Sequence, residues 1–284
     1  MRRHPTFHDW FNLYGKTIDA IAFDVDGVLI RGREPIPGAP DLLRELRRRR
    51  VPFGLLTNDG CHSPEEKSGF LRACGMDVGA EDLISCGHGL EELKEKHGWT
   101  DTLFYVLGSL GTPCFAERIG LRVTRRPEEI DQCAGVIVGE KRYDWHDHIT
   151  AAYNFFLRHP DRLLIAPNPD ETYPHGAGLM GVASGATTRL IQRLCAAAGT
   201  TITPVYLGKP HAPIFEHFHH FLEKRLNRAV DRNRVLMVGD SLTSDIPGGQ
   251  SFGYQTALTL TGMTTEEMLR NSPEKPDIVI AALT

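Results

Sequence analysis

Two carboxylates stand one residue apart at the end of a strand-like apolar segment. The segment "IDAIAFDVDG", residues 18–27, leads into Asp24, Val25, Asp26 and Gly27. In an extended chain residues i and i+2 point the same way, so both carboxylates can face one substrate. One can attack as a nucleophile, while the other protonates a leaving oxygen and later activates water. Gly27 has no side chain and so lets the backbone turn tightly beneath the substrate, directly after the two carboxylates.

Polar side chains also follow three other strand-like segments. The ends of "FGLLTND", "VYLGKP" and "LMVGD" carry Thr57, Asn58, Asp59, Lys209 and Asp240, followed by Ser241, Ser244 and Asp245. In open parallel sheets the ligand crevice lies beyond the carboxyl ends of the strands. We therefore expect these groups to converge with the first aspartate pair on one site.

Such a crevice would hold several acidic groups and one lysine. Carboxylates that share a crevice repel and raise each other's pKa unless a cation lies among them. A hard divalent ion resolves the conflict, and oxygen-only ligands favour Mg²⁺. Phosphate fits this site, because Mg²⁺ and Lys209 can neutralise its oxygens while the Thr57 hydroxyl donates a hydrogen bond. The residues thus predict chemistry on a phosphoryl group.

Four segments together carry a family resemblance. "DVDGV" at 24–28, Thr57-Asn58, Lys209-Pro210 and "GDSLTSD" at 239–245 resemble, in order, the four motifs of the haloacid dehalogenase (HAD) superfamily. The long interval between the second and third motifs looks like the C2-type cap of the class IIA, NagD-like branch. The resemblance implies a phosphomonoester hydrolase that acts on a small phosphorylated metabolite.

The resemblance also implies a role for each motif residue. Asp24 would be the nucleophile that forms an aspartyl-phosphate, and Asp26 the acid/base. Thr57 and Asn58 would hold the phosphoryl group, and Lys209 would steady both that group and Asp24.

Metal ligands follow from the same resemblance. Mg²⁺ would be bound by Asp24, the Asp26 carbonyl and Asp240, with Asp245 in support. One departure from the branch lies beside the second motif, where Asp59 follows Thr57-Asn58 and the branch commonly has another asparagine. This extra charge could alter how the substrate approaches.

Residues 87–202 have strand and helix patterns of their own. We expect them to form an inserted α/β cap, with 1–86 and 203–284 forming the catalytic core. A cap excludes water from a reactive intermediate and supplies specificity contacts. Asn168, Asp170 and Ser184 are the candidate substrate contacts. An equally weighted alternative is that Asn168-Pro169-Asp170 is only a turn, since these are turn-forming residues. Ala183 stands where the branch usually has glycine.

The elements that must position these groups alternate between apolar runs and helix-like segments, which is typical of parallel βαβ units. We therefore predict an α/β fold, with a doubly wound, mostly parallel Rossmann-like core and a C2-type cap. Ser63-Pro64-Glu65-Glu66 has the features of a helix start, and Gly75 of a helix stop. The predicted strands are 18–24, 51–57, 103–107, 135–139, 163–166, 205–207, 235–239 and 254–260.

Bulk composition excludes some classes of partner. The 284 residues carry a net charge of only −4, so no bulk electrostatic partner such as nucleic acid or an anionic membrane is expected. No apolar run approaches the roughly 20 residues that span a bilayer, and the first residues lack an apolar signal core. A cytoplasmic location follows. Six cysteines without Cys-x-x-Cys spacing favour reduced thiols. The family resemblance also implies that a homodimer could form through the cap, as in similar proteins.

Other functions stay open. A catalytically silent binding or scaffold protein could use the same fold. A dehalogenase of the same superfamily would use different chemistry, but dehalogenation would not require Asp26, so the presence of Asp26 favours phosphoryl transfer. The histidines of segment 211–220 could be a metal cluster, but their helical spacing favours the outer face of an amphipathic helix. Nucleoside monophosphates, phosphoglycolate, pyridoxal phosphate, glycerol phosphate and sugar phosphates all remain candidate substrates.

Overall fold

The chain divides into two compact units. The computed structural model describes residues 4–141, 143–176 and 179–284. The core unit comprises 1–57, 64–84 and 209–284, and the inserted unit comprises 58–63 and 85–208. The inserted unit therefore begins at 85 where the sequence suggests 87, and ends at 208 where it suggests 202. Segment 58–63, which begins with Asn58 of the second motif, groups with the inserted unit.

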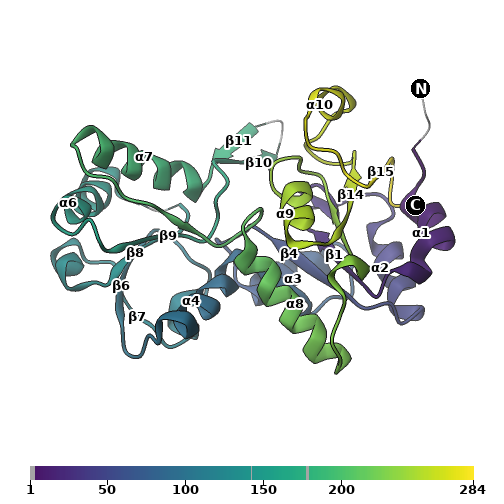
Figure 1. The fold of residues 1–284 in the computed structure, drawn as a ribbon, viewed down its shortest axis with the longest axis horizontal. Coiled ribbons are helices and arrows are strands. Elements are labelled where there is room, and N and C mark those ends of the chain that lie inside the picture. Colours follow the sequence, from purple (N-terminus) through teal and green to yellow (C-terminus); the bar gives the residue numbers. More distant parts are fainter. Residues whose placement is uncertain (1–3, 142, 177–178) are drawn as a thin grey trace. The chain divides into compact units, whose positions relative to one another are not determined.

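A six-stranded sheet forms the centre of the core unit (Figure 1). Its order is β15-β14-β13-β1-β4-β5, and β1 pairs in parallel with both β13 and β4. The strands are β1 (Ala20–Asp24), β4 (Phe53–Thr57), β5 (Leu83–Ser85), β13 (Val235–Gly239), β14 (Gln255–Thr259) and β15 (Ile278–Ile280). The first and fourth motifs therefore end adjacent strands.

Helices of the core unit pack on both faces of this sheet. They are α1 (Phe7–Tyr14), α2 (Ala39–Arg48), α3 (Pro64–Ala73), α8 (Ala212–Leu226), α9 (Asp245–Phe252) and α10 (Glu266–Asn271). Alternate residues of β1 point to opposite faces. Ile21 and Phe23 join one buried cluster with α1 and α2, whereas Ala20 and Ala22 join another with α8. The C-terminus lies beside α1 (Figure 1), where Phe7 N donates to the Ala282 carbonyl at 2.9 Å.

The inserted unit is built on a parallel sheet of its own. Its order is β12-β9-β8-β6-β7. The strands are β6 (Leu103–Leu107), β7 (Arg122–Thr124), β8 (Gly135–Val138), β9 (Leu163–Ala166) and β12 (Val205–Tyr206). The helices are α4 (Gly89–His97), α5 (Phe115–Arg118), α6 (Thr150–Arg158) and α7 (Ser184–Ala197).

Side-chain alternation also explains the packing of this second sheet. Tyr105 and Leu107 of β6 lie in a buried cluster with residues of α6 and α7, whereas Phe104 and Val106 lie in a cluster with residues of α4 and α5. Both faces of the strand are thus apolar, as expected for a parallel sheet covered on two sides. The inserted unit has its own core.

Two antiparallel hairpins and several short helical turns complete the chain. The hairpins pair β2 (Ile30–Arg31) with β3 (Glu34–Pro35), and β10 (Thr172–Gly176) with β11 (Leu179–Val182). The short helical elements are η1 (Gly15–Thr17), η2 (Ala80–Asp82), η3 (Cys86–His88), η4 (Pro127–Gln132), η5 (Trp145–Ile149) and η6 (Arg232–Arg234).

The predicted α/β class with mostly parallel strands is confirmed. Each predicted strand matches an observed one to within a few residues, and α3 begins at Pro64 as predicted. The sequence patterns missed several strands, most of them only two or three residues long: β2, β3, β5, β7, β10, β11 and β15. Among the described residues, no helix is long and apolar enough to cross a membrane.

Candidate active site

The first and fourth motifs lie next to each other at the carboxyl end of the core sheet. Asp24 is the last residue of β1, and Asp240 follows the last residue of β13. In the register of these parallel strands Phe23 pairs with Val238, and on the other side Asp24 pairs with Leu56 of β4. Thr57, which ends β4, is 3% exposed. The sheet order thus gathers side chains that are far apart in sequence.

Lys209 lies buried among the acidic groups. Its Nζ is 2.6 Å from Asp24 Oδ1 and 2.7 Å from Asp245 Oδ1, and it donates to the Leu56 carbonyl at 3.2 Å. Burial alone would lower the pKa of the Lys209 ammonium, but the two carboxylates outweigh it and raise the pKa above its usual range. Lys209 therefore carries a permanent positive charge that fixes the position of Asp24.

One lysine does not balance the acidic charge at this end of the sheet. Asp24, Asp240 and Asp245 are all buried, and each offers an oxygen within 4.8 Å of those of the other two. Burial raises the pKa of Asp24 well above its usual range despite the neighbouring Lys209. Burial and the Asp245 charge raise the pKa of Asp240 to about 7. An added cation would relieve this repulsion, and a set of carboxylate oxygens suits a hard divalent ion.

Asp245 contacts both Lys209 and the backbone of the turn that carries Asp240. Its Oδ1 contacts Lys209, and its Oδ2 accepts hydrogen bonds from the backbone N–H groups of Asp240 and Ser241, both at 3.1 Å. A substituent on Gly239 would collide with the Asp245 side chain, since a Cβ there would lie 2.2 Å from Asp245 Cβ. The first residue of α9 thus holds the turn that follows β13.

Asp26 lies in different surroundings from Asp24. Strand β1 ends at Asp24, so the alternation of side chains along a strand does not extend to Asp26. The Asp26 side chain is 45% exposed, and its Oδ2 lies 2.8 Å from Lys67 Nζ. Gly27, the next residue, has φ +93°, which agrees with the predicted turn. An exposed carboxyl next to a buried one suits a group that exchanges protons with solvent and substrate.

Asn58 and the predicted cap contacts form a network within the inserted unit. Asn58 Nδ2 donates to Asp170 Oδ2 at 2.9 Å, and Asp170 N donates to Asn168 Oδ1 at 2.9 Å. Asn168 Nδ2 donates to Glu140 Oε1 at 2.6 Å, and Ser184 Oγ donates to the Asn168 carbonyl at 3.1 Å. Asn168 therefore makes the local contact of an Asx turn, which agrees with the turn alternative. Its role as a substrate contact stays a prediction.

Comparisons with known proteins agree with the four motifs. Residues 21–122 match the family model of haloacid dehalogenase-like hydrolases, and residues 206–284 match a second model described as HAD-hydrolase-like. Mouse chronophin is 31% identical over 252 residues, covering 87% of this chain and 82% of chronophin. The chain belongs to the haloacid dehalogenase-like hydrolases.

Two further similarities place this HAD-like hydrolase among phosphatases. A dihydroxyacetone phosphatase of Corynebacterium glutamicum is 29% identical over 261 residues, covering 92% of this chain and 87% of that protein. The structure of NagD from E. coli K-12 superposes with a TM-score of 0.76 at 25% identity, covering 94% of this chain and 97% of NagD. The predicted resemblance to the NagD-like branch is confirmed, and the chain is a HAD-type phosphatase.

Lys67 is a site residue that the sequence reasoning did not identify. It lies in the first turns of α3, its side chain is 8% exposed, and it contacts the predicted acid/base Asp26. A lysine in a helix usually lies in solvent, so its residue type gave no signal. Its position did, since α3 begins a few residues after the second motif of this hydrolase.

One histidine of segment 211–220 contradicts its prediction. His219 does not lie on the outer face of α8, because it is 8% exposed and its Nδ1 lies 3.1 Å from Tyr254 Oη. Burial lowers the pKa of His219. The side chain packs beside Phe252 and Tyr254, where the ring fills space between α8 and the end of α9. It is a packed core histidine of the hydrolase.

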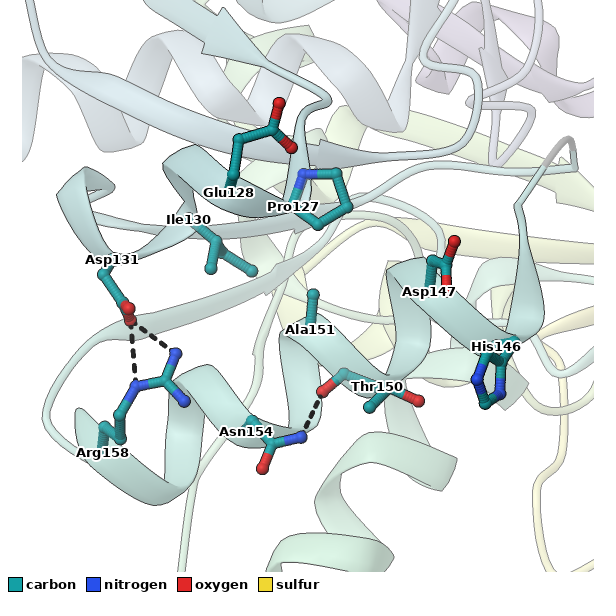
Figure 2. A pocket seen from close by; sticks show the side chains of 10 residues that line it. All are labelled: Pro127, Glu128, Ile130, Asp131, His146, Asp147, Thr150, Ala151, Asn154 and Arg158. Carbon is teal, nitrogen blue, oxygen red and sulfur yellow. Dashed lines mark hydrogen bonds and ion pairs between the residues drawn. The ribbon is translucent and has the colours of Figure 1, made fainter.

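A separate hollow lies in the inserted unit, and none of the predicted site residues lines it (Figure 2). Arg158 donates to Asp131 Oδ1 at 2.7 Å, and Asn154 Nδ2 donates to the Thr150 carbonyl at 2.9 Å. Arg158 and Asn154 thus each have a hydrogen-bond partner among the residues that line the hollow. Its lining residues are Pro127, Glu128, Ile130, Asp131, His146, Asp147, Thr150, Ala151, Asn154 and Arg158.

Proposed function

We propose that this phosphatase hydrolyses phosphomonoesters of small metabolites through an aspartyl-phosphate on Asp24, with Mg²⁺ as its cofactor. The observation that carries the proposal is the buried group of Asp24, Lys209, Asp240 and Asp245, whose negative charge exceeds its positive charge. Such an arrangement is unfavourable in an empty pocket and favourable around a divalent cation and a phosphate.

The donor atoms fit Mg²⁺. Asp24 and Asp240 would supply carboxylate oxygens, and Asp245 orients the turn that carries Asp240. The family resemblance adds the Asp26 backbone carbonyl as a further proposed ligand. Oxygen ligands of this kind, completed by water and substrate phosphate, match the preference of Mg²⁺. When bound, the ion would neutralise the phosphoryl oxygens and draw the substrate to Asp24.

In the first half-reaction Asp24 attacks the phosphorus atom. A bond forms between a carboxylate oxygen of Asp24 and phosphorus, while the bond from phosphorus to the leaving oxygen breaks. Asp26 in its acid form gives its proton to that leaving oxygen. Lys209 holds Asp24 in place through the 2.6 Å contact, and the proposed phosphate ligands Thr57 and Asn58 follow one another at the end of β4.

In the second half-reaction water releases the phosphate. The Asp26 carboxylate removes a proton from a water molecule as its oxygen bonds to phosphorus. The bond from phosphorus to Asp24 then breaks, which restores the Asp24 carboxylate and leaves Asp26 protonated for the next cycle. Lys67 lies at 2.8 Å from Asp26 Oδ2 and keeps that carboxyl in one orientation.

We propose that residues 87–202 act as a cap that excludes water and selects the leaving group. The inserted unit has its own sheet and core, which suits a part that is folded before substrate binds. The relative named dihydroxyacetone phosphatase spans nearly the whole chain, so small phosphorylated polyols and ketoses belong in the first substrate panel, beside nucleotides, sugar phosphates and pyridoxal phosphate.

Turnover of p-nitrophenyl phosphate tests the proposal. We expect Mg²⁺-dependent release of p-nitrophenol that EDTA abolishes, and a loss of at least about 10³-fold in kcat for Asp24→Asn. Asp41→Asn is a matched control, because Asp41 is an exposed carboxylate on α2, where its Oδ1 lies 2.6 Å from Arg44 Nη1. Full activity of Asp24→Asn would refute the assigned nucleophile.

A further inference from the structure

The loop that follows β14 lies against the fourth motif. Strand β14 pairs in parallel with β13, and Gly239 pairs with Leu258, so the chain leaves β14 beside Asp240. Residues 261–264, here named the clamp loop, connect β14 towards α10. Thr264 is 2% exposed although it lies in a loop. The other three residues of the loop are partly or largely exposed, so the burial of Thr264 points to specific contacts of its side chain.

The clamp loop encloses one oxygen of the Asp240 carboxylate. Met263 N donates to Asp240 Oδ2 at 2.6 Å. A Cβ on Gly262 would lie 1.7 Å from the same oxygen, and a Cβ on Gly27 would lie 2.2 Å from it. Real Cβ atoms do not approach an oxygen so closely, so both positions require glycine. Asp240 Oδ2 is thus held between the turn of the first motif and the clamp loop.

Two threonine hydroxyls tie the same loop to the backbone of both motifs. Thr264 Oγ1 donates to the Asp240 carbonyl, and Thr261 Oγ1 donates to the Gly27 carbonyl at 2.8 Å. The Thr261 backbone is itself held, since its N–H donates to Thr259 Oγ1 at 3.1 Å. The loop therefore connects the turn after Asp24 to the turn after β13, which are the two turns that carry the proposed metal ligands.

From these contacts we infer that the clamp loop positions Asp240 for metal binding, with Gly262, Met263 N–H and Thr264 as its working parts. The inference rests on the proposed Mg²⁺ site. Because one carboxylate oxygen is fixed by the protein, the other is held in one direction and loses little freedom when it binds a cation. Groups that orient a metal ligand typically contribute 10- to 100-fold to affinity, roughly, although they never touch the ion.

Isothermal titration of Mg²⁺ into the whole protein, freed of metal with EDTA and then dialysed, tests the inference without using activity. We expect Gly262→Ala to weaken Mg²⁺ binding by about 10- to 100-fold. Thr264→Val removes the hydroxyl at nearly constant shape and should weaken binding by about tenfold, whereas Thr264→Ser keeps the hydroxyl and should bind within about threefold of the wild type.

Gly69→Ala is the matched control. Gly69 lies in α3, has no heavy atom within 4 Å of an added Cβ, and has no positive φ, so Mg²⁺ affinity should not change. The thermal midpoint of each variant in EDTA separates positioning from folding. The thermal midpoint of Thr264→Val should stay within a few degrees of the wild-type value. If the hydroxyl served only to stabilise the fold, its removal would instead lower the midpoint further.

The outcomes are distinguishable. Wild-type Mg²⁺ affinity in both Gly262→Ala and Thr264→Val overturns the inference while leaving the Mg²⁺ site intact. Equal losses in Thr264→Val and Thr264→Ser also overturn it, because the hydroxyl would then be irrelevant. If the wild-type protein itself binds no Mg²⁺, the proposed cofactor is wrong, and the inference falls with it. Weak binding in Gly262→Ala and Thr264→Val, with recovery in Thr264→Ser, supports it.

Discussion

Each unit of the chain buries a carboxyl group whose pKa is raised, and the two groups have different neighbours. Asp24 in the core unit contacts a lysine and lies among two further carboxylates. Glu140 in the inserted unit is 5% exposed and accepts a hydrogen bond from the neutral amide of Asn168. Burial raises the pKa of Glu140 to about 7. Glu140 also has charged neighbours, since Asp59 and Asp170 raise its pKa further and Lys141 lowers it. What distinguishes Asp24 is its direct contact with a buried lysine and the two buried carboxylates close enough to share one ion with it.

The difference also separates two uses of polar groups inside a protein. Glu140 closes a chain of hydrogen bonds through Asn168 and Asp170 that holds one turn of the inserted unit. Such a network can be satisfied by neutral groups and stabilises a single conformation. The cluster around Asp24 cannot be satisfied by the chain alone, because it contains more acidic than basic groups. We therefore propose that the cluster around Asp24 carries the chemistry, whereas the hydrogen bonds of Glu140 hold the turn that contains the predicted substrate contacts Asn168 and Asp170.

The largest expected effect concerns the proton-transfer group of the core site. Asp26→Asn should lower kcat for p-nitrophenyl phosphate by about 10²- to 10⁴-fold, since an amide neither protonates the leaving oxygen nor activates water. Mg²⁺ affinity, measured by calorimetry, should stay near the wild-type value because the backbone carbonyl is unchanged. Unchanged turnover would contradict the acid/base role of Asp26.

Removing the positive charge of Lys209 tests whether this residue compensates the buried carboxylates of the core unit. Lys209→Met leaves Asp24 and Asp245 without their cation, and we expect the free energy of unfolding in EDTA to fall by about 3–5 kcal/mol. Adding Asp24→Asn to Lys209→Met should recover part of this loss, because one uncompensated charge is then absent. Urea unfolding of both variants measures this, with exposed Lys16→Met as a control.

A loss of stability in Lys209→Met no larger than in Lys16→Met would show that Lys209 does not compensate buried charge. Equal stability of the single and double variants would show that Asp24 is not the group it compensates.

Replacing Glu140 tests how the buried carboxyl group of the inserted unit affects stability at different pH. A carboxyl whose pKa rises from 4.5 to about 7 on folding binds a proton more tightly in the folded state. The stability this provides is complete below pH 4.5 and is lost as the pH rises through about 7. Glu140→Gln removes this dependence on pH. The free energy of unfolding of the variant minus that of the wild type should therefore rise by up to about 3 kcal/mol between pH 4.5 and pH 8.

Urea unfolding of both proteins across this range, at constant Mg²⁺, measures that difference. Because titration of the core aspartates is common to both proteins, it cancels in the comparison. A difference that does not change with pH would mean that Glu140 is ionised at the same pH in the folded and unfolded chains.

The smallest expected effect concerns Lys67. Its contact with Asp26 orients a side chain that is already partly exposed, so Lys67→Met should lower kcat by about tenfold and leave KM nearly unchanged. Lys67→Arg keeps the charge and should recover most of the loss. Steady-state kinetics with p-nitrophenyl phosphate checks both. Wild-type kcat in Lys67→Met would show that Asp26 needs no such support.

The sequence predicted that Asp24, Lys209 and Asp240 come together, because each of them follows a recognisable strand. Apolar runs ending in Asp24, Thr57 and Asp240 give both the strand and the edge at which its polar residue lies. Strands such as β5 and β7 were not predicted, since three residues are too few to show a periodicity. Their pairing depends on neighbouring strands that already exist.

Contacts between distant segments account for what the sequence did not reveal. The approach of Gly262 to Asp240 depends on the pairing of β13 with β14, and glycine alone does not indicate which neighbour it approaches. His219 has the spacing of an exposed helix position, but Tyr254 and Phe252 cover it. Lys67 likewise has an ordinary helical sequence context. Each of these needs three-dimensional neighbours for its interpretation.

Single-turnover phosphorylation is the most direct test of Asp24 as the nucleophile. The enzyme is mixed with p-nitrophenyl phosphate and Mg²⁺, quenched in acid within the first turnover, digested, and analysed by mass spectrometry. We predict an acid-stable, hydroxylamine-sensitive phosphoryl group on the peptide that contains Asp24, and none in Asp24→Asn. A phosphoryl group on any other residue, or rapid turnover of Asp24→Asn without a phosphopeptide, would contradict an aspartyl-phosphate mechanism at this position.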